Sequence, residues 1–145
     1  MAGPAQVDAA RERVLAEHRE VLEATLDAAD AVAAESDALS EGRTLRRRLR
    51  ERLAARDLLA CYPAVLGTAV AAAGRDLAAD PVPAPPHVVV TSTGPLLRGT
   101  TSDGRLLVTV RTFAVRTDSN IGGDIGIRYR RTGASAADTL DITLV

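Results

Sequence analysis

The sequence has no lysine and no tryptophan, and it contains one cysteine, two histidines and three residues of tyrosine or phenylalanine. The single Cys61 cannot form an internal disulfide, and it leaves no cysteine cluster for a zinc site. The scarcity of aromatic rings disfavours binding to single-stranded nucleic acid, whose bases stack on such rings. No apolar run approaches the roughly 20 residues that cross a bilayer, and charged residues interrupt the start of the chain. We therefore expect a cytoplasmic protein that does not associate with membranes.

Acidic and basic residues occupy different parts of the 145-residue chain. Residues 1–42 carry ten acidic and three basic side chains, residues 43–57 carry two and seven, and residues 58–145 carry seven and eight. Every basic residue is arginine, which we interpret as coding bias of a GC-rich genome rather than as recognition chemistry. The net charge of −1 therefore conceals an acidic N-terminal segment followed directly by a basic one.

Apolar residues recur at helical spacing through the first half of the chain. The pattern predicts one long amphipathic helix over residues 7–35 and a second helix over about residues 41–60. Pro63 suits the first position of a third helix that runs to about Ala73. Residues 80–86 then hold four of the seven prolines, which predicts an extended connector where the helical part ends.

From His87 onward the apolar period changes from about 3.6 residues to about 2, which is typical of strands. The expected strands are residues 87–92, 95–101, 105–116, 124–131 and 139–145. Glycine, proline, aspartate and asparagine separate them, as turns between strands require.

One hairpin can be predicted together with its register. Asp103-Gly104 is typical of a two-residue turn, which would place Ser102 opposite Arg105. In that register Leu97 lies opposite Val110, and one face of the pair is apolar while the other is mixed. This is the pattern of an antiparallel sheet that is covered on one side only.

Further along, the apolar positions change from even to odd residue numbers between Val110 and Phe113. A strand that keeps its direction can accommodate such a change with one extra residue. We therefore predict a β-bulge near Arg111 and Thr112.

These elements together predict an α+β fold, with three N-terminal helices packed on one face of a roughly five-stranded antiparallel meander sheet. The helical part would span residues 7–79, the proline-rich connector residues 80–86 and the sheet residues 87–145. Separation at the connector would leave a bare apolar sheet face, so we expect residues 1–145 to form a single domain.

The densest charge lies in RTLRRRLRERLAAR, residues 43–56, which has seven arginines in fourteen positions. A helical projection separates a stripe of leucines from an outer side of arginines. The outer arginines, which we regard as possible partner or phosphate contacts, are Arg43, Arg46, Arg47 and Arg50. We expect other arginines of this helix to pair with acidic residues of an antiparallel first helix. Those acidic residues are Glu17, Glu20, Glu23, Asp27 and Asp30.

The remaining residues give no sign of a catalytic, cofactor or metal site. His18 lies on the apolar stripe of the first helix, His87 opens a strand, and Cys61 fits a small buried position. Residues 118–126 match only the start of a calcium loop, because Tyr129 stands where the bidentate carboxylate is needed. We therefore predict no catalytic residue, no cofactor and no metal.

Three segments carry a resemblance to a known family. They are VLAEHREVLEA at residues 14–24, YPAVLGTAVAAAG at residues 62–74, and the stretch from PPHVVV to TFAV at residues 85–115. The chain resembles a family of small uncharacterised haloarchaeal proteins, a domain of unknown function. The shared residues are core and turn positions, so the resemblance implies no activity and no site.

We interpret the chain as a non-enzymatic protein-interaction or self-association module, because no catalytic constellation is present. Its partner would be a second copy or another protein. The alternative is nucleic-acid binding through residues 43–56. This hypothesis is favoured if the four outer arginines face solvent together. A second alternative is a small-molecule pocket of at least about 300 Å³ between helices and sheet, with His18, Tyr62 or Arg111 as polar contributors.

Overall fold

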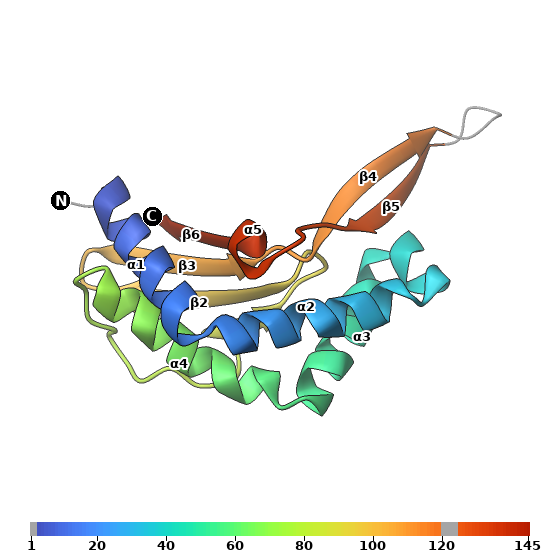
Figure 1. Cartoon of the computed structure of the whole chain (residues 1–145). Helices are drawn as coiled ribbons and strands as arrows, with labels where there is room; N and C mark the ends of the chain where they lie inside the picture. The colour runs from blue at the N-terminus through green and yellow to red at the C-terminus, as the bar shows by residue number, and fades with distance from the viewer. Residues whose placement is uncertain (1–2, 120–124) are drawn as a thin grey trace.

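The computed structural model describes residues 3–119 and 125–145, and it confirms the expected α+β class (Figure 1). The helices come first and the strands follow. The helical elements are α1 (Pro4–Glu17), α2 (Arg19–Ala33), the 3-10 helix η1 (Ser36–Ser40), α3 (Gly42–Ala55), α4 (Leu58–Ala72) and the short α5 (Ala136–Thr139). The strands are β1 (Val88–Val90), β2 (Pro95–Thr101), β3 (Gly104–Val110), β4 (Phe113–Ser119), β5 (Ile125–Arg131) and β6 (Leu140–Leu144).

The first helical segment is broken, so the prediction of one helix over residues 7–35 is wrong. His18 leaves helical geometry with φ −124° and ψ 22°, and it separates α1 from α2. The Nε2 atom of His18 lies 2.7 Å from the hydroxyl oxygen of Thr68 in α4. A tertiary contact therefore accompanies the break, whereas the apolar repeat continues through it and gives no warning.

The predicted second and third helices have other boundaries. Helix α3 ends at Ala55, and Asp57 adopts a left-handed conformation (φ 58°) before α4 begins at Leu58. Pro63 lies inside α4 rather than at its start. The buried stripe of α4 runs on both sides of the proline, through Leu58, Tyr62, Val65, Leu66, Ala69 and Val70. Burial of this stripe outweighs the loss of one helical hydrogen bond at the proline.

Four strands form the main antiparallel sheet in the order β1-β2-β3-β6. Leu97 lies opposite Val108 rather than Val110, and Thr101 pairs with Gly104, so the predicted hairpin register is wrong. A Cβ atom at Gly104 would lie 2.2 Å from the carbonyl oxygen of Val145, and φ is +128°. Gly104 is therefore needed in the ladder beside β6, and the turn residues precede it. The observed register differs from the predicted one by two residues, from Val110 to Val108 opposite Leu97. Side chains alternate between the two faces of a strand, so the predicted apolar and mixed faces are unchanged.

The segment after β3 leaves the sheet, so the predictions of a bulge and of a simple meander are wrong. Strand β3 ends at Val110, and β4 pairs only with β5 in a separate two-stranded sheet that projects from the body (Figure 1). The peptide N–H groups of Thr112 and Phe113 donate to the carbonyl oxygen of Thr93, at 2.8 and 3.0 Å. The change in apolar parity thus marks the passage from one sheet to another. We call the β4–β5 hairpin the arm.

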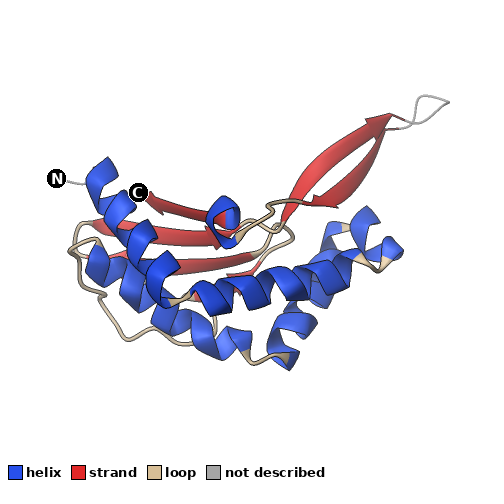
Figure 2. Ribbon diagram, viewed as in Figure 1, coloured by secondary structure: helices blue, strands red, loops and turns tan. Residues whose placement is uncertain are grey.

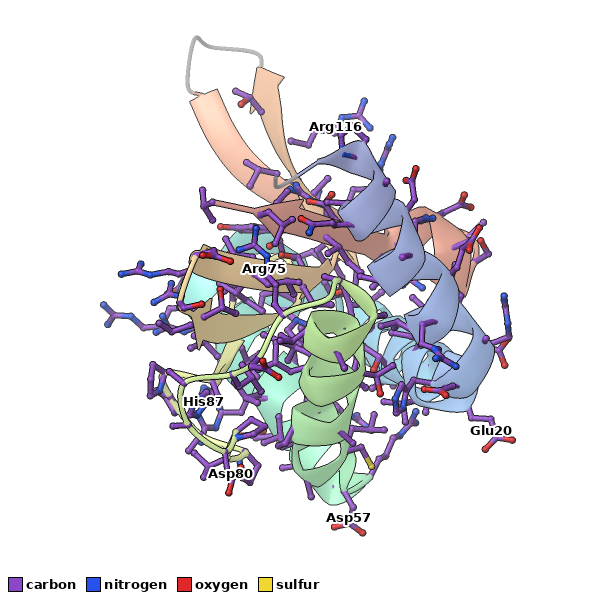
Figure 3. All side chains as sticks on the ribbon, turned by 90° about the vertical axis from the view of Figure 1, so that its left-hand side faces the viewer. Glu20, Asp57, Arg75, Asp80, His87 and Arg116 are labelled. Atoms are coloured by element: carbon purple, nitrogen blue, oxygen red, sulfur yellow. The ribbon has the colours of Figure 1, made fainter. Side chains whose placement is uncertain are left out.

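The helices cover one face of the main sheet, as Figure 2 shows. Helix α4 packs on β1, β2 and β3, α1 packs on β6, and α3 contacts β1. One cluster of buried apolar side chains extends from Ala10 in α1 to Ile142 in β6. On the opposite face of the sheet, Arg98, Leu107 and Thr109 are only partly buried. The proline-rich connector, residues 80–86, lies between α4 and β1, and Figure 3 shows Asp80 at its start and His87 just after its end.

Candidate functional site

Helix α3 divides its arginines between two sides of a buried leucine stripe. Leu45, Leu49 and Leu53 are fully buried and fix the orientation of the helix on the core. Arg48 and Arg52 lie on the side that faces the end of α2. Their guanidinium groups bind the same carboxylate, that of Glu35, at 2.7 and 2.9 Å.

This pairing differs from the one that the sequence predicts. Among the described residues, no ion pair joins α3 to Glu17, Glu20, Glu23, Asp27 or Asp30. Glu17 instead pairs with Arg13 at 3.5 Å, and Asp30 lies 2.9 Å from Nε of Arg131. The physical reason is that η1 folds α3 back on the C-terminal end of α2, where Glu35 is the available acid.

The Glu35 carboxylate is electrostatically coupled to both arginines. Hydrogen bonds from Arg48 and then from Arg52 hold the pKa of Glu35 below its usual value, and partial desolvation acts in the opposite direction. Both guanidinium groups are thereby occupied inside the molecule. Arg48 and Arg52 therefore have a structural role in joining α3 to the end of α2.

The four predicted contact residues all lie on the other side of α3, and all are exposed. We call Arg43, Arg46, Arg47 and Arg50 the outer arginine face. Arg47 has a weak ion pair with Glu51 at 3.7 Å, in which both side chains are more than half exposed. Arg43, Arg46 and Arg50 have no hydrogen bond or ion pair with any described residue. Three of the four arginines on this face therefore carry positive charge that no ion pair with a described residue offsets.

A surface groove of about 410 Å³ begins at the N-terminal end of this face. Arg43 and Arg46 line it, whereas Arg47 and Arg50 do not. The other lining residues come from the start of α3, from β1 and the turn after it, and from β5: Gly42, Val89, Val90, Thr91, Ser92 and Tyr129. The fold thus adds hydroxyl groups and an aromatic ring to two of the predicted arginines, and sequence reasoning did not identify Ser92 or Tyr129 as partners.

The arm supplies a second set of arginines. In its register Arg116 lies opposite Arg128, and Arg130 follows on the same face. All three are exposed. Val115 and Tyr129 form a pair on the other face. The alternation of Arg128 and Arg130 with Tyr129 was visible in the sequence, but the projection of these strands from the body was not.

The residues proposed for a small-molecule pocket do not come together. Tyr62 is fully buried, and its phenol oxygen lies 2.7 Å from the hydroxyl oxygen of Thr25. Arg111 pairs with Asp141 at 3.0 Å, and His18 contacts Thr68. None of the three lines the groove beside α3, and a pocket that His18, Tyr62 or Arg111 contributes to stays a prediction.

The remaining candidates have local partners. Nδ1 of His87 accepts a hydrogen bond from the peptide N–H of Val82 at 3.3 Å. Cys61 donates its thiol to the carbonyl oxygen of Asp57 at 3.4 Å and is partly buried. The calcium-loop comparison at residues 118–126 falls mostly outside the described residues.

Two further properties concern metals and membranes. Within residues 3–119 and 125–145, no group of three or more histidine, cysteine or acidic side chains is placed to hold a metal ion. In the same part of the chain no single helix has the length and apolarity to span a membrane. Helices α3 and α4 together have this length and apolarity, but the two helices are bent by 89° relative to each other.

Comparison with known proteins gives a family and no relative of known activity. The searches of curated proteins and of solved structures returned no match. A family model described as Domain of unknown function (DUF7988) matches residues 8–145, which is nearly the whole chain. The chain therefore belongs to the family described as Domain of unknown function (DUF7988).

Proposed function

We propose that the protein binds duplex nucleic acid through the phosphate backbone, with the outer arginine face of α3 as the principal contact. The observation that supports this most strongly is the separation of the α3 arginines. Arg48 and Arg52 both bind the Glu35 carboxylate, while Arg43, Arg46 and Arg50 have no partner among the described residues. Unneutralised guanidinium groups on one face of a helix are the chemistry that binds phosphate oxygens.

The net charge of −1 does not oppose this proposal. At physiological ionic strength, exposed charges farther apart than about 8 Å are largely screened from each other. A phosphate at α3 therefore responds to the nearest arginines rather than to the acidic side chains of α1 and α2. Local charge determines binding here, while net charge bears on solubility and long-range approach.

Aromatic burial favours a duplex over a single strand. Single strands bind by stacking their bases on exposed aromatic rings. Phe113 and Tyr62 are at most 1% exposed, which leaves Tyr129 as the accessible ring of the three. The arm supports the same preference, because a two-stranded ribbon fits a duplex groove and carries Arg128 and Arg130 on one face.

The test is fluorescence anisotropy of a labelled duplex of mixed sequence, titrated at several salt concentrations. One variant combines Arg43→Gln, Arg46→Gln, Arg47→Gln and Arg50→Gln. A control of equal net charge combines Arg13→Gln, Arg19→Gln, Arg56→Gln and Arg105→Gln, four arginines that are also exposed.

Each phosphate contact contributes about 0.9 to the slope of log K against log salt. We expect the first variant to lose most of the affinity. The slope of log K against log salt should become shallower by roughly 3 to 4. The control should keep the slope of the wild type. The proposal fails if the wild type does not bind at low ionic strength, or if both variants lose affinity equally.

A second candidate function is self-association or binding to another protein, without enzymatic activity. Val115 on the arm is 56% exposed, and it lies opposite Tyr129 in the hairpin register. The exposed acids of α1 and α2, including Glu12, Glu20 and Glu23, complement the basic arm of a second copy. Sedimentation analysis should show an oligomer that Val115→Asp converts to a monomer. A wild type that is monomeric at all concentrations contradicts this candidate.

Two properties of the protein in the cell are also proposals. We infer a cytoplasmic location, which cell fractionation with an antibody would test. We infer a haloarchaeal origin from the resemblance of residues 14–24, 62–74 and 85–115 and from the absence of lysine. The genome that encodes the chain decides the second point.

A further inference from the structure

The N-terminal end of α3 has backbone donors without a cap. Glu41 occupies the N-cap position, but its side chain forms no capping hydrogen bond to the helix. Its carboxylate accepts instead from the hydroxyl of Thr44 at 2.9 Å. The first helical bond is donated by Leu45 to the carbonyl of Glu41 at 3.0 Å. The preceding N–H groups, from Gly42 to Thr44, have no acceptor within the helix.

The groove beside this helix end combines apolar surface from β1 with polar side chains that can donate hydrogen bonds. Its two charged lining residues are Arg43 and Arg46, and no carboxylate lines it. The side chains of Ser92 and Tyr129, like those of the two arginines, have no hydrogen-bond partner among the described residues. Four unpartnered side chains from three separate parts of the chain therefore face one groove.

The framework that holds these groups is fixed by local bonds. Thr91 and Gly94 exchange backbone hydrogen bonds at 3.0 and 3.2 Å, and the hydroxyl of Thr91 donates to the carbonyl of Gly94 at 2.8 Å. This turn presents Ser92 at the groove. On the opposite wall the Tyr129 ring packs against Gly42. The turn and the Tyr129 ring are thus held in place before any ligand arrives, which lowers the entropic cost of binding.

We propose that this groove is a specific binding site for one phosphate group. A tetrahedral phosphate has several oxygens that can accept bonds from α3, from the β1–β2 turn and from β5 together. A carboxylate, with two oxygens in one plane, would leave some of these donors unsatisfied. The volume of about 410 Å³ leaves room for an attached sugar, and it lies within the range of about 300–1,000 Å³ typical of small-ligand sites.

The phosphate can belong to a small phosphate ester or to the end of a nucleic-acid strand, since both present the same group. The inference shares Arg43 and Arg46 with the proposed duplex contact, and it otherwise rests on Ser92, Tyr129 and the helix end. It can therefore hold where the duplex proposal fails, and the reverse is also true.

The test is a titration of the ¹⁵N-labelled protein, followed by NMR, with inorganic phosphate against chloride at equal ionic strength. A nucleoside 5′-monophosphate and short duplexes with and without a 5′-phosphate are titrated in parallel. We expect saturable shifts of the amides of Gly42, Arg43, Thr44 and Ser92 with phosphate and not with chloride.

Two variants remove one hydroxyl each and keep the shape of the side chain: Ser92→Ala and Tyr129→Phe. Each should weaken phosphate binding by about 10-fold or more, the usual effect of one hydrogen bond to a charged group. Arg43→Gln combined with Arg46→Gln should weaken it by about 10-fold or more. Ser102→Ala, and Arg13→Gln with Arg19→Gln, serve as matched controls outside the groove and should bind as the wild type does.

The outcomes separate the two proposals. Phosphate shifts without duplex binding support the groove and overturn the duplex contact. Duplex binding that free phosphate does not displace, with unaltered affinity in Ser92→Ala and Tyr129→Phe, overturns the groove. Tighter binding of the 5′-phosphorylated duplex than of its unphosphorylated counterpart identifies a strand end as the source, and tighter binding of the monophosphate identifies a small ester. Shifts equal to those caused by chloride overturn the inference.

Discussion

The ring of Tyr129 on the arm lies directly against Gly42 at the start of α3. A Cβ atom at residue 42 would be 2.4 Å from Oη of Tyr129 and 3.1 Å from Cζ. The first distance is far shorter than a carbon–oxygen contact allows, and the second is tighter than most carbon–carbon contacts. A side chain at residue 42 would therefore require the Tyr129 ring to move, and the groove owes one of its walls to this contact.

Gly42→Ala is accordingly expected to destabilise the protein by about 1–3 kcal/mol, the usual cost of overpacking. Helix propensity alone would favour alanine by up to about 1 kcal/mol, so the sign of the measured change discriminates between the two effects. Urea unfolding of Gly42→Ala, Tyr129→Phe and the double variant provides the measurement. Loss of the phenol oxygen removes the closest contact, so the alanine should cost less in the Tyr129→Phe background. An alanine variant as stable as the wild type contradicts the contact.

The types of the elements could be predicted from the sequence because they depend on local patterns. The apolar stripe of α3 and the alternation in β2 and β3 are visible without the fold. The helix boundary at His18 was missed because a contact with Thr68, in a different helix, accompanies it. The left-handed residue Asp57 was also missed, because the apolar repeat continues from α3 into α4 without a break at this position.

The candidate site was predictable in part. Projection around the helix axis places the outer arginines together, because that arrangement depends only on helical periodicity. Their groove partners Ser92 and Tyr129 come from a turn and from the arm, and only tertiary structure brings these near α3. Glu35 was missed as the partner of Arg48 and Arg52, because its position depends on how η1 folds α3 back.

Gly94 is expected to be intolerant of any side chain. Its φ of +147° is rarely adopted by other residues, and a Cβ atom would lie 1.8 Å from the carbonyl oxygen of Val110. Gly94→Ala should cost about 3 kcal/mol or more in urea unfolding, since both the β1–β2 turn and the end of β3 must move. Gly67→Ala is a matched control in α4, where no atom lies within 4 Å of the added Cβ. It should stabilise the protein by roughly 0.5–1 kcal/mol.

Tyr62 is expected to make stability fall at alkaline pH. Burial raises the pKa of its phenol well above the ordinary value of 10.0, and the hydrogen bond with Thr25 acts in the opposite direction. Below pH 10 the phenol is neutral in both states and its burial stabilises the fold. Above that pH the unfolded chain ionises first, so this stability is lost as pH rises, by up to about 1.4 kcal/mol per pH unit.

Urea unfolding between about pH 8 and pH 11 compares the wild type with Tyr62→Phe, which has no group to ionise at this position. The wild type should be more stable near pH 8 by about 1 kcal/mol, because the variant lacks the bond to Thr25. The difference should shrink above pH 10 and then reverse. Parallel curves for the two proteins would show that the phenol ionises equally in both states.

Glu35 is expected to have the opposite pH dependence. Hydrogen bonds from Arg48 and Arg52 lower the pKa of its carboxyl below the reference value of 4.5. A carboxyl with a lowered pKa in the folded state contributes stability above the pKa of the unfolded state. That contribution is lost as pH falls below 4.5 and through the folded-state pKa. Glu35→Gln should therefore be less stable than the wild type near neutral pH, with a difference that narrows on acidification.

Urea midpoints measured from about pH 7 to pH 3 test this, and Glu20→Gln is the control. Glu20 is exposed and has no ion pair among the described residues, so its variant should follow the wild type throughout. A Glu35→Gln difference that stays constant across this range would show that the two arginines do not depend on the ionised carboxylate.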